Sequence, residues 1–432
     1  MADFTQGQRI KVASGGELEI VNKLGEGGQG TVYRAKYNGK ELALKWYFPN
    51  KMKDPQRFYD NIVNNIKQGA PNDAFLWPLA ATEWEHNSYG YLMELRKPEY
   101  KDFSRFLLAK ERFANTEAVI NAALNIVSAF RALHDRGYSY QDLNDGNFFV
   151  NPQNGDVMVC DNDNVAPYGE NLGIAGKCRY MAPEVVTGAA LPSIHTDRFS
   201  LAVVLFMLLF LNHPLEGKRT MSPCLTDAHE LKFYGTDPLF IYDPMDDSNR
   251  PVRGVHSNVL RFWPIYPAFI QQTFCEAFSK ESMTGADQQH RVTEKAWQET
   301  FMRLRDCLVK CPSCHDETMI DTSQSQYQCM NCGVSMPTPA LIVAKRTEIP
   351  ILPGAKLTER QLGTDVMADE LILGKVVESK ATGKIGLKNE SSCLWIATLP
   401  SGDQKQFEPG KVIPIKRGLK IDFSNGREAE IK

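Results

Sequence analysis

The sequence predicts a multidomain α+β protein: a two-lobed domain of strands and helices, then a short metal-binding unit, then a small all-β sandwich. Three observations support this prediction. The chain has 432 residues, and at about 150 residues per domain this length favours about three units. Four of the ten cysteines form two close pairs. Beyond residue 349, short β-type segments alternate with turn residues, as in a sandwich or barrel.

The composition is that of a soluble globular protein. Apolar residues make up 43% and charged residues 23%, and the net charge of −3 gives no sign of nucleic-acid binding. The N-terminus lacks the apolar core of a signal peptide. The most apolar stretch, 199–211, is about 13 residues long, whereas a bilayer span needs ~20, so it predicts a buried helix. The cysteine pattern suits a reducing compartment. We therefore expect a cytoplasmic protein without membrane or nucleic-acid partners.

A glycine-rich motif opens the first region. Residues 24–33 read LGEGGQGTVY, a G-x-G-x-x-G pattern followed by valine: Gly25, Gly27, Gly30 and Val32. Glycine lets the backbone approach phosphates closely. A plain hairpin turn and a dinucleotide-binding fingerprint are the alternatives. The latter needs a helix after the last glycine, whereas TVYRAKYNGKELALKWY reads as two strands and a turn. The second strand ends in LALK, which predicts that Lys45 contacts phosphates.

Three acid or amide positions follow in a fixed order. YQDLNDGNFFV places Asp142 and Asn147 five residues apart, and Asp161 follows the apolar run of GDVMVC. These positions match the H-R-D-L-x-x-x-N and D-F-G motifs. Asp142 would accept a hydroxyl proton, while Asn147 and Asp161 would hold magnesium. An acidic surface loop is the alternative, which the order and spacing disfavour.

Farther on, GKCRYMAPE contains A-P-E, HTDRFSLAVVLF reads as an aspartate and a core helix, and HRVTEKAW places Arg291 to pair with Glu184. With these motifs the segment 10–303 resembles the Ser/Thr protein kinase family, with the N-lobe ending near 95. The resemblance implies a bilobal fold, ATP, and Mg²⁺ or Mn²⁺ as cofactor. It also implies that Met93 and Glu94 lie in the strand that holds adenine through its backbone.

Several positions depart from the family pattern. Tyr140 and Gln141 replace the histidine and arginine of H-R-D, and Asn144 replaces a lysine that contacts the γ-phosphate. Residues 162–180 contain no serine or threonine, only tyrosines at 168 and 180. We therefore expect activity that does not depend on activation-loop phosphorylation. Lys177, where Ser/Thr kinases usually have threonine, leaves the residue preference open.

Two further departures concern acidic residues. Asp163 replaces the D-F-G glycine and is an alternative metal ligand to Asp161. The helix glutamate that normally pairs with the strand lysine is missing. The helix predicted from Pro55 offers Asp60, its one interior acid, or Asn64 by position.

The second region, 307–335, is predicted to be a zinc ribbon. Two C-x-x-C pairs are separated by 14 residues, and their cysteines are Cys311, Cys314, Cys329 and Cys332. Two such knuckles complete a tetrahedral thiolate shell without an open position, which indicates structural zinc. Two redox pairs are the alternative. So short a segment cannot bury a sufficient core, so the metal is expected to supply the folding energy.

The third region, 349–432, contains LILGKVV, KIGLKN, WIAT and PGKVIPIKRGLKIDF and resembles a forkhead-associated (FHA) sandwich. It departs from that family in having no histidine after residue 315, so a generic β-sandwich for protein contact stays open. The three regions together resemble bacterial kinases associated with tellurite resistance. That resemblance implies a von Willebrand factor A-like protein and a metal-dependent phosphatase as partners. Two functions remain: a Ser/Thr kinase acting on a protein substrate, or a nucleotide-binding pseudokinase scaffold.

Overall fold

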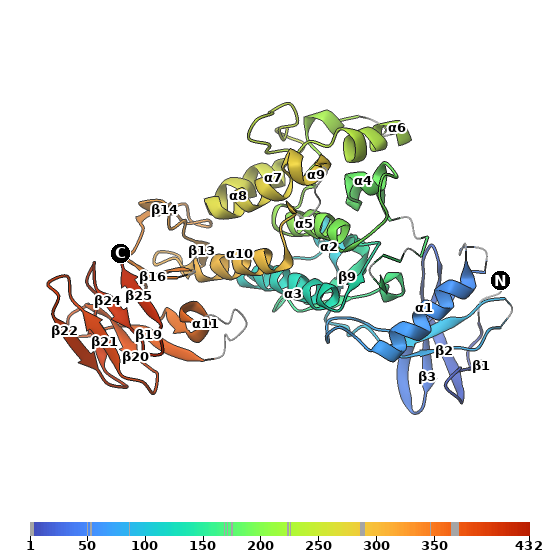
Figure 1. Ribbon diagram of the computed structural model, residues 1–432, viewed down its shortest axis with the longest axis horizontal. Coiled ribbons are helices and arrows are strands. Elements are labelled where there is room, and N and C mark those ends of the chain that lie inside the picture. Colours follow the sequence, from blue (N-terminus) through green and yellow to red (C-terminus); the bar gives the residue numbers. More distant parts are fainter. Residues whose placement is uncertain are drawn as a thin grey trace. The chain divides into compact units, whose positions relative to one another are not determined.

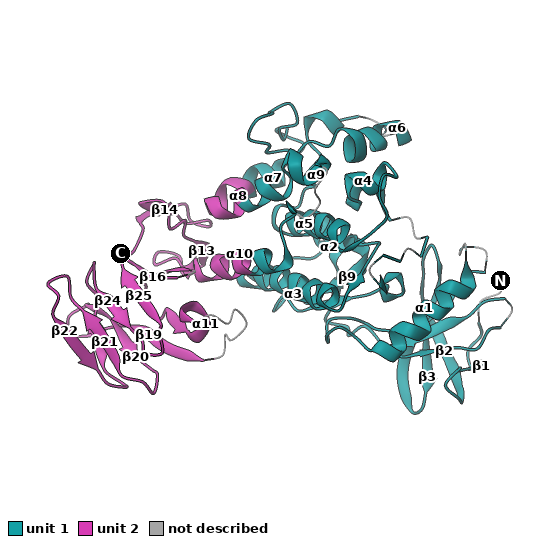
Figure 2. Ribbon diagram, viewed as in Figure 1, with its two compact units in different colours: residues 1–262, 273–298 teal, residues 263–272, 299–432 magenta. Residues whose placement is uncertain are grey.

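The structure, a computed structural model, describes residues 4–49, 51, 54–85, 87–167, 169–170, 172–173, 176–222, 224, 226–285, 290–345, 347–363 and 371–432. The chain divides into two units (Figure 2). Unit 1 comprises 1–262 and 273–298, and unit 2 comprises 263–272 and 299–432. Unit 1 mixes strands and helices, whereas unit 2 holds the paired cysteines and the C-terminal β-sheets. The predicted multidomain α+β fold is confirmed.

The N-terminal lobe of unit 1 is a six-stranded antiparallel sheet in the order β1-β2-β3-β4-β6-β5. The turn between β3 and β4 is Asn38-Gly39, and both residues have positive φ angles (49° and 77°), as tight hairpin turns require. The strands are β1 (Arg9–Lys11), β2 (Glu17–Glu26), β3 (Gly30–Tyr37), β4 (Lys40–Tyr47), β5 (Ala80–Ala81) and β6 (Gly90–Met93). This hairpin replaces the helix that a dinucleotide-binding fingerprint would need.

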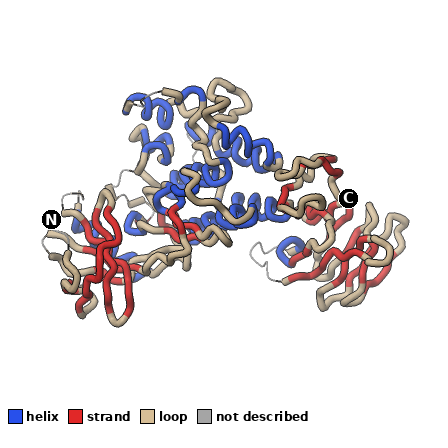
Figure 3. The backbone as a smooth tube through the Cα atoms, turned by 180° about the vertical axis from the view of Figure 1, so that it is seen from behind, coloured by secondary structure: helices blue, strands red, loops and turns tan. Residues whose placement is uncertain are grey.

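Helix α1 (Pro55–Gln68) begins where the sequence predicts. The Asp54 side chain caps it by accepting a hydrogen bond from the Arg57 amide at 3.1 Å, and Gly69, with φ of 72°, ends it. Its apolar face, with Phe58 and Ile62, packs in a core shared with β4 and β6. Figure 3 shows this strand-rich N-lobe as distinct from the helical C-lobe of the same unit.

The C-lobe is built around α3 (Thr116–Asp135) and α5 (Ile194–Phe210), which lie side by side (Figure 1). Every residue from Phe199 to Phe210 is buried, so the predicted buried helix is confirmed. No helix among the described residues is long and apolar enough to span a bilayer. The other helices are α2 (Phe103–Leu107), α4 (Pro183–Val186), α6 (Asp227–Glu230), α7 (Ser257–Phe262), α8 (Ala268–Ala277), α9 (Lys280–Thr284) and α10 (Glu294–Asp306).

Short strands and 3-10 turns of the C-lobe carry the loops of the site. The strands are β7 (Lys101–Asp102), β8 (Tyr138–Ser139), β9 (Phe148–Val150), β10 (Val157–Val159) and β11 (Ala166–Pro167). The turns are η1 (Asp145–Asn147), η2 (Asn162–Asn164) and η3 (Cys178–Tyr180). β9 and β10 are neighbours in the sheet β10-β9-β7, and β8 pairs with β11. The hydroxyl of Tyr140, which follows β8, donates to the carbonyl oxygen of Cys160, which follows β10, so the ends of these two strands lie together.

Unit 2 contains two small hairpins and a β-sandwich. The hairpins are β12 (Leu308–Lys310) with β13 (Glu317–Met319), and β14 (Gln326–Gln328) with β15 (Ser335–Pro337). The sandwich has a six-stranded sheet, β17-β16-β25-β24-β21-β22, and a four-stranded sheet, β18-β19-β20-β23. Both sheets contribute to one apolar core, for example through Trp395 and Leu387.

The sandwich begins slightly earlier than residue 349, because β16 pairs with the last strand, β25. Its strands are β16 (Leu341–Ala344), β17 (Glu348–Pro350), β18 (Lys356–Thr358), β19 (Ile372–Glu378), β20 (Ile385–Asn389), β21 (Trp395–Thr398), β22 (Gln404–Phe407), β23 (Val412–Pro414), β24 (Lys420–Asp422) and β25 (Glu428–Ile431). One short helix, α11 (Glu359–Leu362), follows β18.

Candidate active site

The glycines of the loop between β2 and β3 serve different purposes. The Gly27 amide donates a hydrogen bond to the Gly30 carbonyl oxygen at 2.9 Å, which closes the turn. A Cβ atom on Gly30 would lie 2.1 Å from the Trp46 carbonyl oxygen, so glycine is needed there for β3 to approach β4. At Gly25 the same test finds open space. The backbone at Gly25 is therefore free to approach a ligand.

Lys45 is a buried cation beside this loop. It lies on β4 opposite Val32 of β3, and it is 6% exposed. Its Nζ atom lies 3.1 Å from Asp161 Oδ1, 2.8 Å from Asp163 Oδ2 and 3.4 Å from Gln29 Oε1 of the glycine loop. Burial alone would lower the pKa of Lys45, but the two carboxylates outweigh burial and raise the pKa above its usual value. The lysine therefore stays charged.

The catalytic-loop residues are tied together by hydrogen bonds. Asn144 Nδ2 donates to Asp142 Oδ1 at 3.1 Å, and the Asn144 amide donates to Asn147 Oδ1 at 3.0 Å. Burial raises the pKa of Asp142 to about 6. The charge of Asp161 also raises this pKa, whereas the hydrogen bond from Asn144 and the charge of Lys177 lower it. Asp142 is thus ionised at neutral pH yet more basic than an ordinary aspartate, which suits proton acceptance.

Asp161 and Asn147 provide the oxygen atoms that a hard cation prefers. Asp161 follows β10 with a left-handed backbone (φ 54°), and its side chain is 43% exposed. Asn147 ends η1, and its carbonyl oxygen accepts a hydrogen bond from the Cys160 amide at 2.9 Å. The two segments that carry these side chains are therefore joined, and their donor set fits magnesium.

Helix α1 does not supply the partner of the β4 lysine, contrary to what the sequence suggested. Asp60 is hydrogen-bonded to a neighbouring side chain within the helix, and Asn64 is only half-buried. The face of α1 that is turned to the segment after β10 instead carries Asn61 and Asn65. Their Nδ2 atoms donate to the Val165 carbonyl oxygen at 2.8 Å and 3.0 Å. In the described part of the chain, the acids beside the lysine come from the segment after β10.

Gln141, at the position of the missing arginine, contacts the activation segment directly. Its Nε2 donates to the Glu170 carbonyl oxygen at 2.6 Å, and its Oε1 accepts from the Leu172 amide at 3.3 Å. A neutral amide thus binds two backbone groups without a phosphate. Of the two tyrosines in the segment, Tyr180 is buried in η3, and Tyr168 lies outside the described residues.

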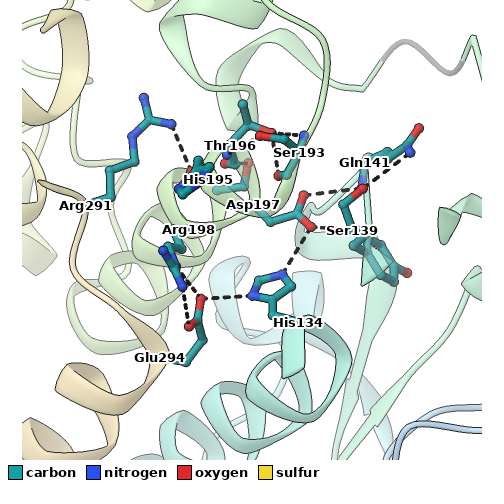
Figure 4. Close-up of polar contacts among 12 residues, drawn as sticks. His134, Ser139, Gln141, Ser193, His195, Thr196, Asp197, Arg198, Arg291 and Glu294 are labelled. Atoms are coloured by element: carbon teal, nitrogen blue, oxygen red, sulfur yellow. Dashed lines mark hydrogen bonds and ion pairs between the residues drawn. The ribbon is translucent and has the colours of Figure 1, made fainter. Parts of the chain in front are cut away.

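Asp197 of α5 anchors the backbone that precedes Asp142 (Figure 4). It accepts hydrogen bonds from the Tyr140 amide at 2.5 Å and from the Gln141 amide at 3.3 Å. The ring of His134, on α3, lies 3.2 Å from Asp197 Oδ2. The catalytic loop is therefore tied to α5, and α5 in turn to α3.

A second buried acid completes this network. Glu294 lies 2.9 Å from His134 Nδ1 and accepts from Arg198 Nε at 2.8 Å (Figure 4). Burial would lower the pKa of His134, but hydrogen bonds to Asp197 and Glu294 raise it to about 9. Burial would raise the pKa of Glu294, but His134 and Arg198 lower it to about 2. The network therefore holds both groups charged at neutral pH.

The predicted pair of Arg291 and Glu184 is present, whereas β6 ends at Met93 and leaves Glu94 just outside the strand. Arg291 and Glu184 form a two-bond ion pair in which both N···O distances are 2.8 Å. Met93 is buried at the end of β6 opposite Ala43, and the neighbouring Glu94 is exposed.

The four paired cysteines of unit 2 converge. Their sulfur atoms all lie within 4.8 Å of one another, with Cys311–Cys332 at 3.8 Å and Cys314–Cys329 at 3.7 Å. Tetrahedral zinc with Zn–S bonds of about 2.3 Å places its sulfurs about 3.8 Å apart, so the cluster fits a zinc ion. Cys307, which is outside the cluster, is buried, and burial raises the pKa of its thiol to about 12, which keeps it protonated.

The two knuckles share one local conformation. The fourth residue after the first cysteine of each pair has a left-handed backbone: His315 with φ of 63° and Gly333 with φ of 72°. Each of these residues donates its amide to the carbonyl oxygen of that first cysteine, at 2.9 Å and 3.0 Å. The repeated turn is what brings both pairs of thiols to a common centre.

Two features of the site were missed from the sequence. One is the contact of Asp163 with Lys45, and the other is the bridge from Gln141 to the activation segment. A signal for the first was available. Tyr47 follows Lys45 by two residues on β4, so both face one side, and Tyr91 lies opposite Lys45. The hydroxyls of both tyrosines donate to Asp163.

Several known proteins are similar in sequence to this chain. Residues 18–294 match the protein kinase domain. Among similar proteins of Dictyostelium discoideum, the probable serine/threonine-protein kinase kinX is 25% identical over 217 residues, which is 45% of this chain and 18% of the relative. The stress-activated protein kinase alpha is 28% identical over 214 residues, which is 46% of this chain and 31% of the relative. The chain thus spans less than a third of the length of these relatives. With a match over more than half of its residues, the chain belongs to the protein kinase family.

Proposed function

We propose that this chain is an ATP- and magnesium-dependent kinase that transfers the γ-phosphate of ATP to serine or threonine of a partner protein. The observation that carries the proposal is the set of linked side chains around Lys45 in unit 1. Lys45 is paired with Asp161, the charge of Asp161 acts on Asp142, and Asn147 is bonded to the segment that ends in Asp161.

Positioning and charge neutralisation carry phosphoryl transfer. Bound magnesium would supply the charge that bridges and neutralises the phosphate oxygens. Asn147 and Asp161 would hold that ion, and Lys45 would contact the α- and β-phosphates. Asp142 would accept the proton of the substrate hydroxyl as its oxygen attacks the γ-phosphorus, and ADP would leave. The glycine loop would cover the phosphates, and the backbone at Met93 and Glu94 would hold adenine.

A cation from the activation segment compensates for the lysine missing at Asn144. Lys177 Nζ lies 3.3 Å from Asp145 Oδ1, and Lys177 acts to lower the pKa of Asp142. Its side chain is 56% exposed, so it can turn to an incoming phosphate. We expect Lys177 to supply the γ-phosphate contact that Asn144 cannot make.

The first test replaces the proton acceptor. Asp142→Asn is expected to lower phosphate transfer to a protein substrate by at least about 10²-fold, because general-base catalysis contributes about that much or more. The rate of the unmodified protein should fall as the pH drops below about 6, where Asp142 becomes protonated. Transfer of radiolabelled γ-phosphate measured from pH 5 to 8 checks both expectations.

Asp161→Ala provides a second loss-of-function control, and Asp156→Asn, an exposed acid of the turn before β10, is the matched neutral variant. Incorporation that survives both Asp142→Asn and Asp161→Ala would come from a contaminating kinase and would contradict the proposal. Phosphoamino-acid analysis of the product decides between serine or threonine and tyrosine.

The second test concerns activation. We propose that the Gln141 amide holds the activation segment, so that no loop phosphate is needed. Gln141→Leu removes the two hydrogen bonds to the activation segment, worth about 1 kcal/mol each, and is expected to lower kcat by up to about 30-fold. Gln153→Leu, at an exposed site, should leave kcat unchanged. Phosphatase treatment of the unmodified protein, checked by intact mass, should also leave kcat unchanged. A phosphotyrosine required at Tyr168 would overturn this part of the proposal.

A pseudokinase scaffold is the second candidate function. It is favoured by the absence of a lysine at Asn144 and by the contact of Asp161 with Lys45, which occupies the metal-binding carboxylate. Nucleotide binding with no transfer to any protein, the chain itself included, would select this candidate.

We further propose that unit 2 recruits partners, with the cysteine cluster as a structural zinc ribbon and the two-sheet sandwich as an FHA-like module. The resemblance to kinases of tellurite-resistance systems suggests a von Willebrand factor A-like protein and a metal-dependent phosphatase as partners, in the cytoplasm. None of the ten cysteines forms a disulfide in the structure. Co-purification with candidate partners, with and without residues 341–432, tests the module.

A further inference from the structure

We propose that Asp163 is the residue that positions Lys45, and that it replaces the helix glutamate of other protein kinases. The inference rests on the proposed function, because it assigns a role within the same nucleotide site. In this chain the inward face of α1 carries amides rather than an acid, and those amides bind the Val165 carbonyl oxygen. The acid that remains beside Lys45 without being exposed is Asp163.

Each oxygen of the Asp163 carboxylate has two donors. Oδ1 lies 3.2 Å from Lys45 Nζ and 3.1 Å from the Tyr91 hydroxyl. Oδ2 lies 2.8 Å from Lys45 Nζ and also accepts from the Tyr47 hydroxyl. An ionised carboxylate offers about four acceptor sites. Because these sites are taken and the side chain is fully buried, Asp163 is not the magnesium ligand.

The donors around Asp163 come from the sheet that carries the glycine loop. Lys45 and Tyr47 face the same side of β4, and Tyr91 is opposite Lys45 in the β4–β6 register. The backbone next to Asp163 is fixed as well. The buried side chain of Asn162 donates to the carbonyl oxygens of Leu76 at 2.8 Å and Val159 at 2.9 Å.

Asp161 and Asp163 therefore have different roles. Asp161 is 43% exposed and can turn from Lys45 to a metal ion, whereas Asp163 is fully buried and stays with Lys45. The placement of Lys45 then needs no charged group from α1. Movement of α1, which breaks the lysine–glutamate pair in other kinases, would reach this ion pair only through the bonds of Asn61 and Asn65 to the Val165 carbonyl oxygen. The lysine is held as long as the segment after β10 is in place.

The test measures MgATP binding by calorimetry on the full chain. Asp163→Asn is expected to weaken binding about 10- to 100-fold, as for loss of one charge-assisted hydrogen-bonded pair. Lys45→Ala combined with Asp163→Asn should bind no more weakly than Lys45→Ala alone, because Asp163 acts through Lys45. Asp60→Asn, the matched acid on α1, should change the dissociation constant less than about 2-fold. Tyr91→Phe keeps every charge and removes one hydrogen bond to Asp163, so it should weaken binding about 5-fold. This variant tests the inference if Asp163→Asn does not fold.

A magnesium titration separates the two aspartates. Asp161→Asn should raise the magnesium concentration needed for half-maximal nucleotide binding, and Asp163→Asn should not. Additive losses in the double variant, an equal magnesium shift for both aspartates, or a loss in Asp60→Asn as large as in Asp163→Asn would overturn the inference. If the unmodified protein binds MgATP with these dependencies but transfers no phosphate, the proposed function fails while the role of Asp163 stands.

Discussion

Removal of zinc is expected to unfold the segment from Leu308 to Pro337 while the kinase lobes stay folded. The four strands of this segment have three residues each, so they cannot bury a core of useful size. Metal binding contributes about 10–16 kcal/mol of apparent folding free energy in comparable zinc-finger peptides. A chelator, or Cys329→Ser, should therefore make this segment the first site of limited proteolysis. Metal analysis of the untreated protein should find one zinc ion per chain.

Cys224→Ser is the matched control, because Cys224 is exposed and lies outside the cluster. It should retain full zinc and the original proteolysis pattern. A well-folded chain with much less than one zinc, or a disulfide between the cysteines of either pair, would contradict the assignment and support redox pairs instead. Thiol titration under denaturing conditions distinguishes these outcomes, since a zinc site leaves all four thiols reduced.

The fold could be predicted from sequence where a motif specifies local geometry. The Asn38-Gly39 turn, the cap at Asp54 and the two C-x-x-C knuckles each depend on a few neighbouring residues. The residue at which the sandwich begins was harder to predict from the sequence. Strand β16 is defined by pairing with β25, more than 80 residues later in the chain, and no local signal marks such a pairing.

The site was predictable to the same extent. Lys45 and Asp161 occupy motif positions, and the structure brings them within 3.1 Å of each other. The partner of Lys45 was not predictable by looking for an acid on α1, because the helix uses amides to reach the Val165 backbone. The position of Asp163 depends on the backbone path after β10. A left-handed residue at Asp161 turns the chain there, and spacing alone does not reveal that turn.

The bridge made by Gln141 follows the same logic. A glutamine in place of arginine reads as a loss when only the phosphate-binding role is considered. Its amide can donate and accept at once, so it binds the backbone on both sides of residue 171, at Glu170 and Leu172. An arginine has no acceptor and could not make the second bond. The departure from the family pattern thus has a structural consequence of its own.

Replacement of His134 is expected to cost about 3–5 kcal/mol of stability, because His134→Ala would leave Asp197 and Glu294 buried with one partner fewer. His134→Ala should also lower kcat, because Asp197 holds the backbone that precedes Asp142. Chemical denaturation measures the free energy of unfolding, and kcat measures the effect on the catalytic loop that carries Asp142. His195→Asn is the matched control on α5, because the neighbouring Arg291 contacts the backbone of His195 rather than its ring.

The pH dependence of stability tests whether the charges of His134 and Glu294 cause the expected loss of stability. The folded-state pKa of His134 is raised from 6.5 to about 9, so its contribution is complete below pH 6.5 and is lost as the pH rises through 9. The pKa of Glu294 is lowered from 4.5 to about 2, so its contribution is complete above pH 4.5 and is lost as the pH falls toward 2. Both contributions are therefore complete between pH 4.5 and 6.5. His134→Ala should remove the decline in stability between pH 7 and 10. An unchanged decline in that variant would show that His134 is neutral in the folded protein.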